Sequence, residues 1–179
     1  MVTKAKYTYE DYLNTPEGER YELIDGELIL VASPNEEHQF ASIRLGSRMY
    51  FYVDEGELGW VFQAPFDIVF SDTEVVQPDI MFISKEREHI RTGANVRGAP
   101  DLVVEILSPS SLRRDWGYKR ELYAKYGVKE YWIADPVHKM VSVMLLKDGV
   151  LELAGTYVEG DTVASTALEG FGVGVSEIF

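Results

Sequence analysis

Apolar and polar residues alternate in several short stretches of the chain, a pattern that predicts strands. Alternation from Arg20 to Val31 around Asp25-Gly26 predicts a β-hairpin, and residues 140–157 with a turn at Asp148-Gly149 predict another. Residues 99–135 read as strand, helix and strand, which implies locally parallel pairing. The expected fold class is therefore α+β (α/β), with a mixed β-sheet flanked by helices and extra β-hairpins.

Helical spacing of apolar residues predicts three helices. The first follows Thr8, which can cap it, and the second runs from about Glu36 to Tyr52 after a cap at Ser33. The apolar spacing of the second helix predicts one buried face, made of Phe40, Ile43, Ser47, Tyr50 and Phe51. The third helix follows Ser111, and its apolar stripe is Leu112, Trp116, Lys119, Tyr123 and Tyr126.

The length of 179 residues suits one domain, 1–179, with a core at about 36–136. A helix and hairpin at 8–31 precede this core, and a hairpin and tail at 137–179 follow it. No apolar run is long enough to span a membrane, and no signal peptide is evident. The chain has no cysteine, which excludes a disulfide framework and a thiolate zinc site. We expect a cytoplasmic protein.

The net charge of −13 limits the partners that the chain can bind. Proteins that bind nucleic acid through phosphate contacts usually present a basic face. The densest basic patch here is Arg113-Arg114 with Lys119-Arg120. A nucleic-acid ligand would therefore need a metal ion or a local patch to offset the overall repulsion.

Two carboxylates fall inside apolar strands, and these are the candidate metal ligands. Asp79 lies in the predicted strand 75–83, and Glu105 lies in the predicted strand 101–107. A buried acid is costly unless it is paired, hydrogen-bonded or bound to a metal. Neighbouring strands are only about 5 Å apart, so one cation could bridge the two acids if their strands pair. Asp101 is about 13 Å along the strand from Glu105, so we interpret it as a strand-start residue.

Lys119 lies at the centre of the apolar stripe of the third helix. One interpretation is that its stem follows the apolar surface and its ammonium reaches solvent. The other is that the ammonium points at the two carboxylates and stabilises charge in a transition state. Two acids, a lysine and an open Mg²⁺ (or Mn²⁺) site form a hydrolytic set for phosphodiesters, with Asp79 and Glu105 as the metal ligands.

Several motifs resemble those of the Uma2 family, also called DUF820, of restriction-endonuclease-like proteins in the PD-(D/E)XK nuclease superfamily. They occur in the order of the family and cover most of the chain. The motifs are 21–27 (YELIDGE), 76–80 (VQPDI), 100–110 (PDLVVEILSPS), the helix with Asp115, Lys119 and Tyr123, and 127–136 (GVKEYWIADP). The resemblance implies a nuclease core of helix, three strands, helix and strand.

The resemblance also assigns site residues. The two acids of the superfamily fall on Asp79 and Glu105, while Leu107 occupies the usual lysine position, so the resemblance moves that lysine to Lys119. Glu22 and His38 match family positions near the site and are supporting residues. From the sequence pattern alone, Glu22 is a strand residue expected to face solvent, and His38 is a lone histidine with a structural role.

Three functions remain open from the sequence. The first is a Mg²⁺-dependent endonuclease that hydrolyses DNA, as a homodimer by the expectation of the family. The second is a catalytically inactive nuclease-fold module for binding or regulation, which the acidic charge favours. The third is a small β-rich metal-binding domain that acts on a small molecule. Metal binding that depends on Asp79 would separate the first function from the second.

Overall fold

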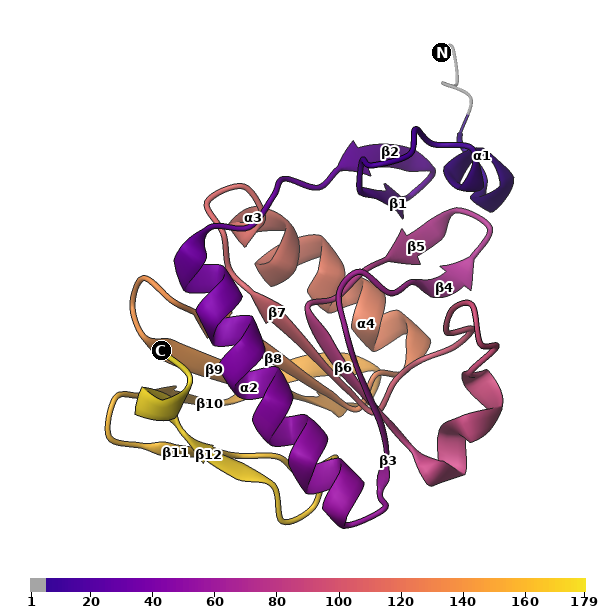
Figure 1. Ribbon diagram of the computed structural model, residues 1–179. Coiled ribbons are helices and arrows are strands. Elements are labelled where there is room, and N and C mark those ends of the chain that lie inside the picture. Colours follow the sequence, from indigo (N-terminus) through magenta and orange to yellow (C-terminus); the bar gives the residue numbers. More distant parts are fainter. Residues whose placement is uncertain (1–5) are drawn as a thin grey trace.

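A six-stranded sheet forms the centre of the computed structural model, which describes residues 6–179 (Figure 1). Its strand order is β10-β9-β8-β7-β6-β3, and only β7 and β8 pair in parallel. The strands are β3 (Gly59–Gln63), β6 (Ile80–Ser84), β7 (Leu102–Ile106), β8 (Glu130–Asp135), β9 (Met140–Lys147) and β10 (Val150–Val158).

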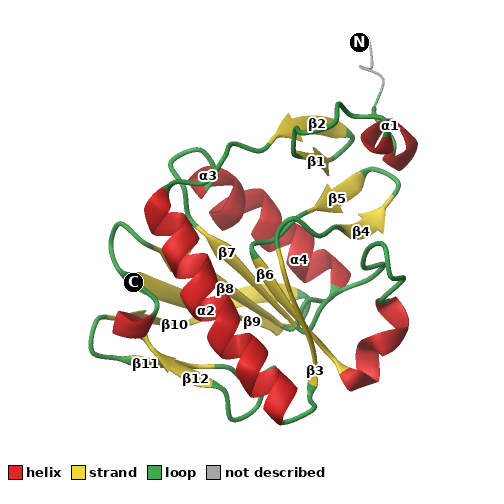
Figure 2. Ribbon diagram, viewed as in Figure 1, coloured by secondary structure: helices red, strands yellow, loops and turns green. Residues whose placement is uncertain are grey.

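A four-stranded antiparallel sheet lies at one end of the molecule beside helix α1 (Tyr9–Leu13), as Figure 2 shows. Its order is β2-β1-β5-β4, and it is built from two hairpins. The strands are β1 (Tyr21–Ile24), β2 (Glu27–Leu30), β4 (Ile68–Ser71) and β5 (Glu74–Val76). The C-terminal tail forms a two-stranded ribbon and a short 3-10 helix, β11 (Thr162–Ala164), β12 (Gly172–Gly174) and η3 (Val175–Glu177).

Helices cover both faces of the six-stranded sheet (Figure 1). Helix α2 (Glu36–Glu55) and the C-terminal tail pack on one face. The segment between β7 and β8 packs on the other face and contains α3 (Leu112–Arg114), η2 (Asp115–Lys119) and α4 (Arg120–Tyr126). A 3-10 helix, η1 (Lys85–Ile90), follows β6. Within residues 6–179, no helix is both long and apolar enough to cross a membrane.

The predicted fold class is confirmed, and several local predictions hold as well. Both predicted hairpins form, and β7 and β8 pair in parallel around the helical segment. Thr8 caps α1 in a capping box with Asp11. The cap of α2 was wrongly predicted: Asn35, not Ser33, accepts a hydrogen bond from the backbone N–H of His38.

The predicted buried face of α2 is wrong. Its four large residues, Phe40, Ile43, Tyr50 and Phe51, are exposed, and the helix instead buries His38, Ala41, Leu45, Gly46, Met49 and Val53. The helix carries two apolar stripes. The stripe of Ala41, Leu45, Met49 and Val53 faces the sheet, and the stripe with the larger aromatic residues faces outward. A Cβ atom added to Gly46 would lie only 2.3 Å from Nε2 of Gln63 in β3, so the close approach favours small side chains there.

The predicted strand 75–83 is two strands that belong to different sheets. The chain leaves the four-stranded sheet after β5 and enters the six-stranded sheet at β6. Pro78, which lacks a backbone N–H, lies in the connection, and the N–H of Gln77 donates to Oε1 of Glu22 instead of to a strand. Asp79 therefore lies at the junction of the two sheets, directly before β6, and not in mid-strand.

The apolar stripe predicted for the third helix is correct only in its second half. Lys119 and Tyr123 are buried, but Leu112 and Trp116 are exposed, and Asp115 is buried in their place. The cause is the wide π-helical turn η2. In such a turn Asp115, four residues before Lys119, lies on the same face as Lys119, whereas Trp116, three residues before it, lies on a different face. Asp115 thus stays below Lys119 while Trp116 turns outward.

Glu130 of β8 ties the C-terminal tail to the central sheet. Its side chain is fully buried. Oε1 accepts a hydrogen bond from the indole of Trp132, and Oε2 accepts four from residues of the tail: Ser165 Oγ, the N–H and Oγ1 of Thr166, and the N–H of Ala167. One carboxylate therefore satisfies five donors.

Glu130→Gln is expected to lower the free energy of unfolding by about 2–3 kcal/mol, because the amide nitrogen cannot accept from these buried donors. Urea unfolding followed by circular dichroism measures the change. Glu121→Ala on the exposed side of α4 is the control and should shift stability by less than about 0.5 kcal/mol. Equal stability of Glu130→Gln and the wild type would contradict this account of the tail.

Candidate active site

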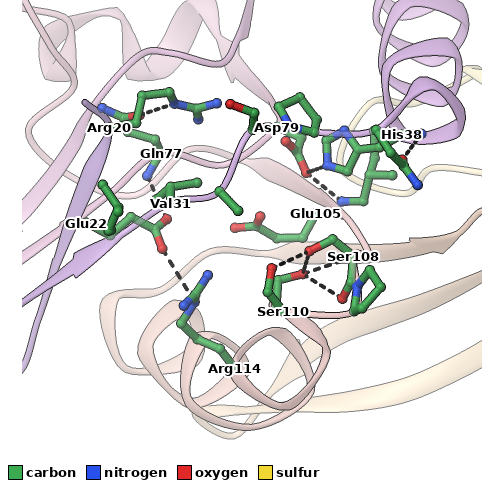
Figure 3. Close-up of a pocket in the computed structure, with 18 of the residues that line it drawn as sticks. Arg20, Glu22, Val31, His38, Gln77, Asp79, Glu105, Ser108, Ser110 and Arg114 are labelled. Carbon is green, nitrogen blue, oxygen red and sulfur yellow. Dashed lines mark hydrogen bonds and ion pairs between the residues drawn. The ribbon is translucent and has the colours of Figure 1, made fainter. Parts of the chain in front are cut away.

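A cavity of about 440 Å³ opens where the two sheets, the N-terminus of α2 and the helical segment after β7 meet. Figure 3 shows several of its polar side chains pointing inward. All five residues that the sequence singled out line it: Glu22, His38, Asp79, Glu105 and Lys119. These residues belong to β1, α2, the junction before β6, β7 and η2, which are far apart in sequence and meet only in the folded chain.

Asp79 is fixed in place by one of its two oxygens. Oδ2 accepts a hydrogen bond from the backbone N–H of Ile106 at 2.7 Å and lies 3.2 Å from Nε2 of His38. Oδ1 takes part in no hydrogen bond among residues 6–179 and belongs to a side chain that lines the cavity. The bond to Ile106 links Asp79 directly to the strand that carries Glu105.

Glu105 is held in the same way. Oε1 accepts hydrogen bonds from Lys119 Nζ at 2.8 Å and from the hydroxyl of Tyr123 at 2.5 Å. Within the described chain, Oε2 accepts none. Strands β6 and β7 pair with Ile80 opposite Val104, so Asp79 and Glu105 are the next pair in register. Within the described residues, Asp79 at the start of β6 and Glu105 in β7 thus each keep one oxygen free of hydrogen bonds at the same cavity.

Lys119 is surrounded by carboxylates. Its Nζ lies 2.8 Å from Glu105 Oε1, 2.8 Å from Glu22 Oε1 and 3.8 Å from Asp115 Oδ1. Only 3% of the residue is exposed, so the interpretation that it reaches solvent is wrong. Glu22, expected to face solvent, is 1% exposed, because β1 is a central strand between β2 and β5.

Burial and the surrounding charges shift the pKa values of this cluster. Burial raises the pKa of Glu105 well above its usual range; Lys119 opposes this shift, while Asp115, Asp79 and Glu22 reinforce it. Burial also raises the pKa of Asp115. Burial alone would lower the pKa of Lys119, but Glu105, Glu22 and Asp115 together raise it, so the ammonium stays charged at neutral pH.

Carboxylates and basic side chains alternate around the cavity. Four carboxylates, Glu22, Asp79, Glu105 and Asp115, lie in or beside the cavity. Two cations pair with them: Lys119, and Arg114, whose Nε lies 3.5 Å from Glu22 Oε2. Arg20 lines the cavity as well, so the three carboxylates that line it, Glu22, Asp79 and Glu105, face three basic side chains. Among residues 6–179, both oxygens of Asp115 and Oε2 of Glu22 are buried without a hydrogen-bond partner.

This donor set fits a hard divalent cation that keeps much of its water shell. Within residues 6–179, no three His, Asp or Glu side chains are grouped as a ready metal cage. Mg²⁺, however, is commonly held by one or two carboxylates plus water and phosphate oxygens. The free oxygens of Asp79 and Glu105 supply two such ligands.

Sequence reasoning missed two residues that define this geometry. Tyr123 was noted only as part of a motif and an apolar stripe, yet it is fully buried and donates to Glu105. Arg114 was noted only as part of a basic patch, yet it lines the cavity and pairs with Glu22. Spacing on the helix could have placed Tyr123 below Lys119. No sequence signal links Arg114 to Glu22, because the two residues are 92 positions apart. The direction of Arg114 also depends on the helical segment that contains the π turn, which the sequence did not predict.

Comparisons with known proteins agree with this architecture. The profile of the Uma2 family, described as "Putative restriction endonuclease", matches residues 8–176. A curated relative, "Uncharacterized protein slr1290" of Synechocystis sp., is 31% identical over an alignment of 124 residues, and the match covers 66% of this chain. The chain matches 63% of the length of that relative.

A solved structure has the same fold. It is a "putative nuclease belonging to DUF820" from Anabaena variabilis, 21% identical, with a TM-score of 0.80 over 96% of this chain and 97% of that chain. The family match over nearly the whole chain, together with this fold, shows that the protein belongs to the Uma2 family of restriction-endonuclease-like proteins.

Proposed function

We propose that the protein is a Mg²⁺-dependent endonuclease that hydrolyses phosphodiester bonds of DNA. One observation supports this most: Asp79, directly before β6, lies beside Glu105 of the neighbouring strand β7, and among residues 6–179 each acid is fixed by one oxygen and has the other free of hydrogen bonds at the cavity. The charged ammonium of Lys119 lies 2.8 Å from one of them. The family description and the DUF820 neighbour agree with this class of activity.

Asp79 and Glu105 would hold the cation. A bound Mg²⁺ would lower the pKa of a coordinated water and offset charge on a phosphate oxygen. The backbone N–H of Ile106 and the ring of His38 keep Asp79 oriented, and Tyr123 keeps Glu105 oriented. These contacts leave little freedom to either acid, so the ligand pair is preorganised.

Lys119 supplies the fixed positive charge. Its ammonium stays protonated because three carboxylates raise its pKa. Held at the wall of the cavity beside Glu105, it can orient a water molecule or offset charge that develops on the phosphate. In this role Lys119 would replace the lysine that the superfamily usually has at the position occupied here by Leu107.

The acidic charge of the chain makes the cation central to DNA binding. A net charge of −13 repels phosphates. Arg20 and Arg114 line the cavity and are the local cations that a phosphate would meet. A divalent cation held by Asp79 and Glu105 would add positive charge beside these arginines and so favour the entry of one phosphodiester.

A catalytically inactive binding module is the second candidate. It is favoured by the contacts of Lys119, whose ammonium is already engaged by Glu22 and Glu105 and is almost fully buried. Such a module would bind nucleic acid or a partner without cutting. Cleavage measured on wild type and site variants separates the two functions.

The affinity for Mn²⁺ is expected to rise with pH. Glu105 has a raised pKa, so protons compete with the metal until the pH exceeds that value. Calorimetric titration with Mn²⁺ from about pH 5 to pH 8 measures the trend. Glu105→Gln should bind Mn²⁺ at least about tenfold more weakly and lose most of the pH dependence. A wild-type affinity that is constant or falls over this range would contradict the assignment of Glu105 as a ligand.

Lys119→Met is expected to lower Mg²⁺-dependent cleavage of plasmid DNA by at least about a hundredfold, because the fixed charge is lost. The variant should also unfold more easily, by about 3–5 kcal/mol, since three buried carboxylates lose their shared cation. Glu22→Gln added to Lys119→Met should recover part of the stability but none of the cleavage. Stability and activity are thereby separated.

Lys125→Met is the matched control for this experiment, because Lys125 is exposed on α4, away from the cavity. It should cleave like the wild type. A wild type that binds DNA in the presence of Mg²⁺ but never cuts it would support the inactive module. Wild-type cleavage by Lys119→Met would remove Lys119 from the catalytic set.

A further inference from the structure

Lysine and arginine side chains line the cavity at three positions, and they differ in what already engages them. The ammonium of Lys119 lies 2.8 Å from Glu22 Oε1 and 2.8 Å from Glu105 Oε1. The Nε atom of Arg114 lies 3.5 Å from Oε2 of the buried Glu22. Arg20, in contrast, forms no ion pair with any carboxylate of residues 6–179. Of these three cations, Arg20 therefore has the charge that a ligand can use most readily.

The side chain of Arg20 is held through its Nε atom, which donates a hydrogen bond to Oε1 of Gln77 at 3.1 Å. Among residues 6–179, the two terminal nitrogens of Arg20 take part in no hydrogen bond, and neither is buried. In Figure 3 the guanidinium group extends from Gln77 into the cavity. The coplanar N–H groups at the end of a guanidinium form a fork that binds two oxygens of one phosphate or carboxylate group.

Gln77 is fixed in the orientation that accepts from Arg20. Its Nε2 donates to Oδ1 of Asp67 at 2.8 Å and to the hydroxyl of Tyr12 at 3.0 Å. An ionised carboxylate only accepts hydrogen bonds, so the NH2 end of the amide faces Asp67 and the carbonyl end faces Arg20. The hydroxyl of Tyr12 also donates to Oδ1 of Asp67 at 2.8 Å and so holds that carboxylate in place. Asp67 therefore determines which end of Gln77 meets the arginine.

The backbone of Gln77 links this contact to the carboxylate cluster. Its N–H donates to Oε1 of Glu22 at 3.1 Å, the same oxygen that lies 2.8 Å from Lys119 Nζ. Arg20 directly precedes β1 and is two residues before Glu22, so in extended chain both side chains point to the same side. Gln77 is in turn two residues before Asp79. Gln77 thus fixes the guanidinium group relative to both acids.

The ligand that suits this guanidinium group is an anion with two neighbouring oxygens. The free oxygens of Asp79 and Glu105 at the same cavity fit a divalent cation, and Mg²⁺ commonly binds phosphate oxygens beside its carboxylate ligands. A phosphodiester has two non-bridging oxygens, so it is an anion that the arginine and the cation can both bind. This argument favours a phosphodiester over a carboxylate as the partner of Arg20.

We propose that Arg20 binds the non-bridging oxygens of the phosphodiester that enters the cavity, and that Gln77 is the positioning residue that directs its guanidinium group there. The inference rests on the proposed function for the identity of the anion. The three cations of the cavity then have different tasks. Lys119 and Arg114 stabilise the buried carboxylates, and Arg20 contacts the substrate.

Fluorescence anisotropy of a labelled DNA duplex, at fixed ionic strength with Ca²⁺ as the divalent cation, tests the role of Arg20. Arg20→Met should bind DNA at least about tenfold more weakly than the wild type, the scale for losing charge-assisted hydrogen bonds. Arg20→Lys keeps the charge but has no planar fork, so it should also bind more weakly than the wild type. Arg20 is only partly buried, so the unfolding midpoint of both variants should stay near that of the wild type.

Lys147→Met is the matched control for charge. It removes the same positive charge from an exposed residue outside the cavity. Because charge at an exposed and distant position is screened by salt, its affinity for DNA should stay within about twofold of the wild type.

The role of Gln77 is tested by combining substitutions. Gln77→Met keeps the backbone N–H that Glu22 accepts and removes the contact with Arg20, so it should weaken DNA binding by about three- to tenfold. In the Arg20→Met background the same change should have almost no effect, because Gln77 acts through the arginine. Tyr12→Phe breaks the same network on the side away from Arg20 and should bind DNA like the wild type.

The outcomes separate this inference from the nuclease assignment. A wild type that cuts DNA, with Arg20→Met binding DNA as tightly, would overturn the role of Arg20 and leave the nuclease standing. Weaker binding by Arg20→Met in a protein that never cuts would support Arg20 in a binding module.

Two further results would each overturn one part of the inference. Equal binding by Arg20→Lys and the wild type would overturn recognition by the planar guanidinium group. Additive effects of Gln77→Met and Arg20→Met would overturn the positioning role of Gln77. A wild type that binds no DNA would overturn the inference as a whole.

Discussion

One buried ammonium holds the candidate site together. Lys119 pairs with Glu22 from the small sheet and with Glu105 from the large sheet, and it lies near Asp115 on its own helix. Removing carboxylates from water is costly, and the cost is offset only where a cation meets them. The positions of the two sheets and the helical segment relative to one another therefore depend on this contact. Lys119 engages Oε1 of Glu105 and leaves Oε2 for the cavity, while Ile106 and His38 engage Oδ2 of Asp79.

Local patterns in the sequence predicted much of the fold. The hairpins follow from Asp-Gly turns, and the parallel pair follows from the strand–helix–strand order. The placement of Asp79 beside Glu105 followed from two interrupted apolar stretches, although Asp79 turned out to precede its strand. These features depend on residues close in sequence or on the periodicity of single elements.

The rest could not be predicted, because it depends on contacts between distant segments. Glu22 looked like a solvent-facing strand residue until β5 packed beside its strand. Phe40 and Ile43 were assigned to the core because periodicity does not tell which of two apolar stripes meets a sheet. The π turn that buries Asp115 and exposes Trp116 has no sequence signal. The roles of Asp79, Glu105 and Lys119 in catalysis remain predictions.

The central claim is that Asp79 and Glu105 hold one divalent cation. Crystals grown at neutral pH and soaked in Mn²⁺ test it most directly, because the anomalous signal of manganese locates the ion. The account predicts one peak with Asp79 Oδ1 and Glu105 Oε2 at about 2.0–2.3 Å, and no such peak in Asp79→Asn crystals. A peak elsewhere with neither residue as ligand, or no peak at saturating Mn²⁺, would contradict it.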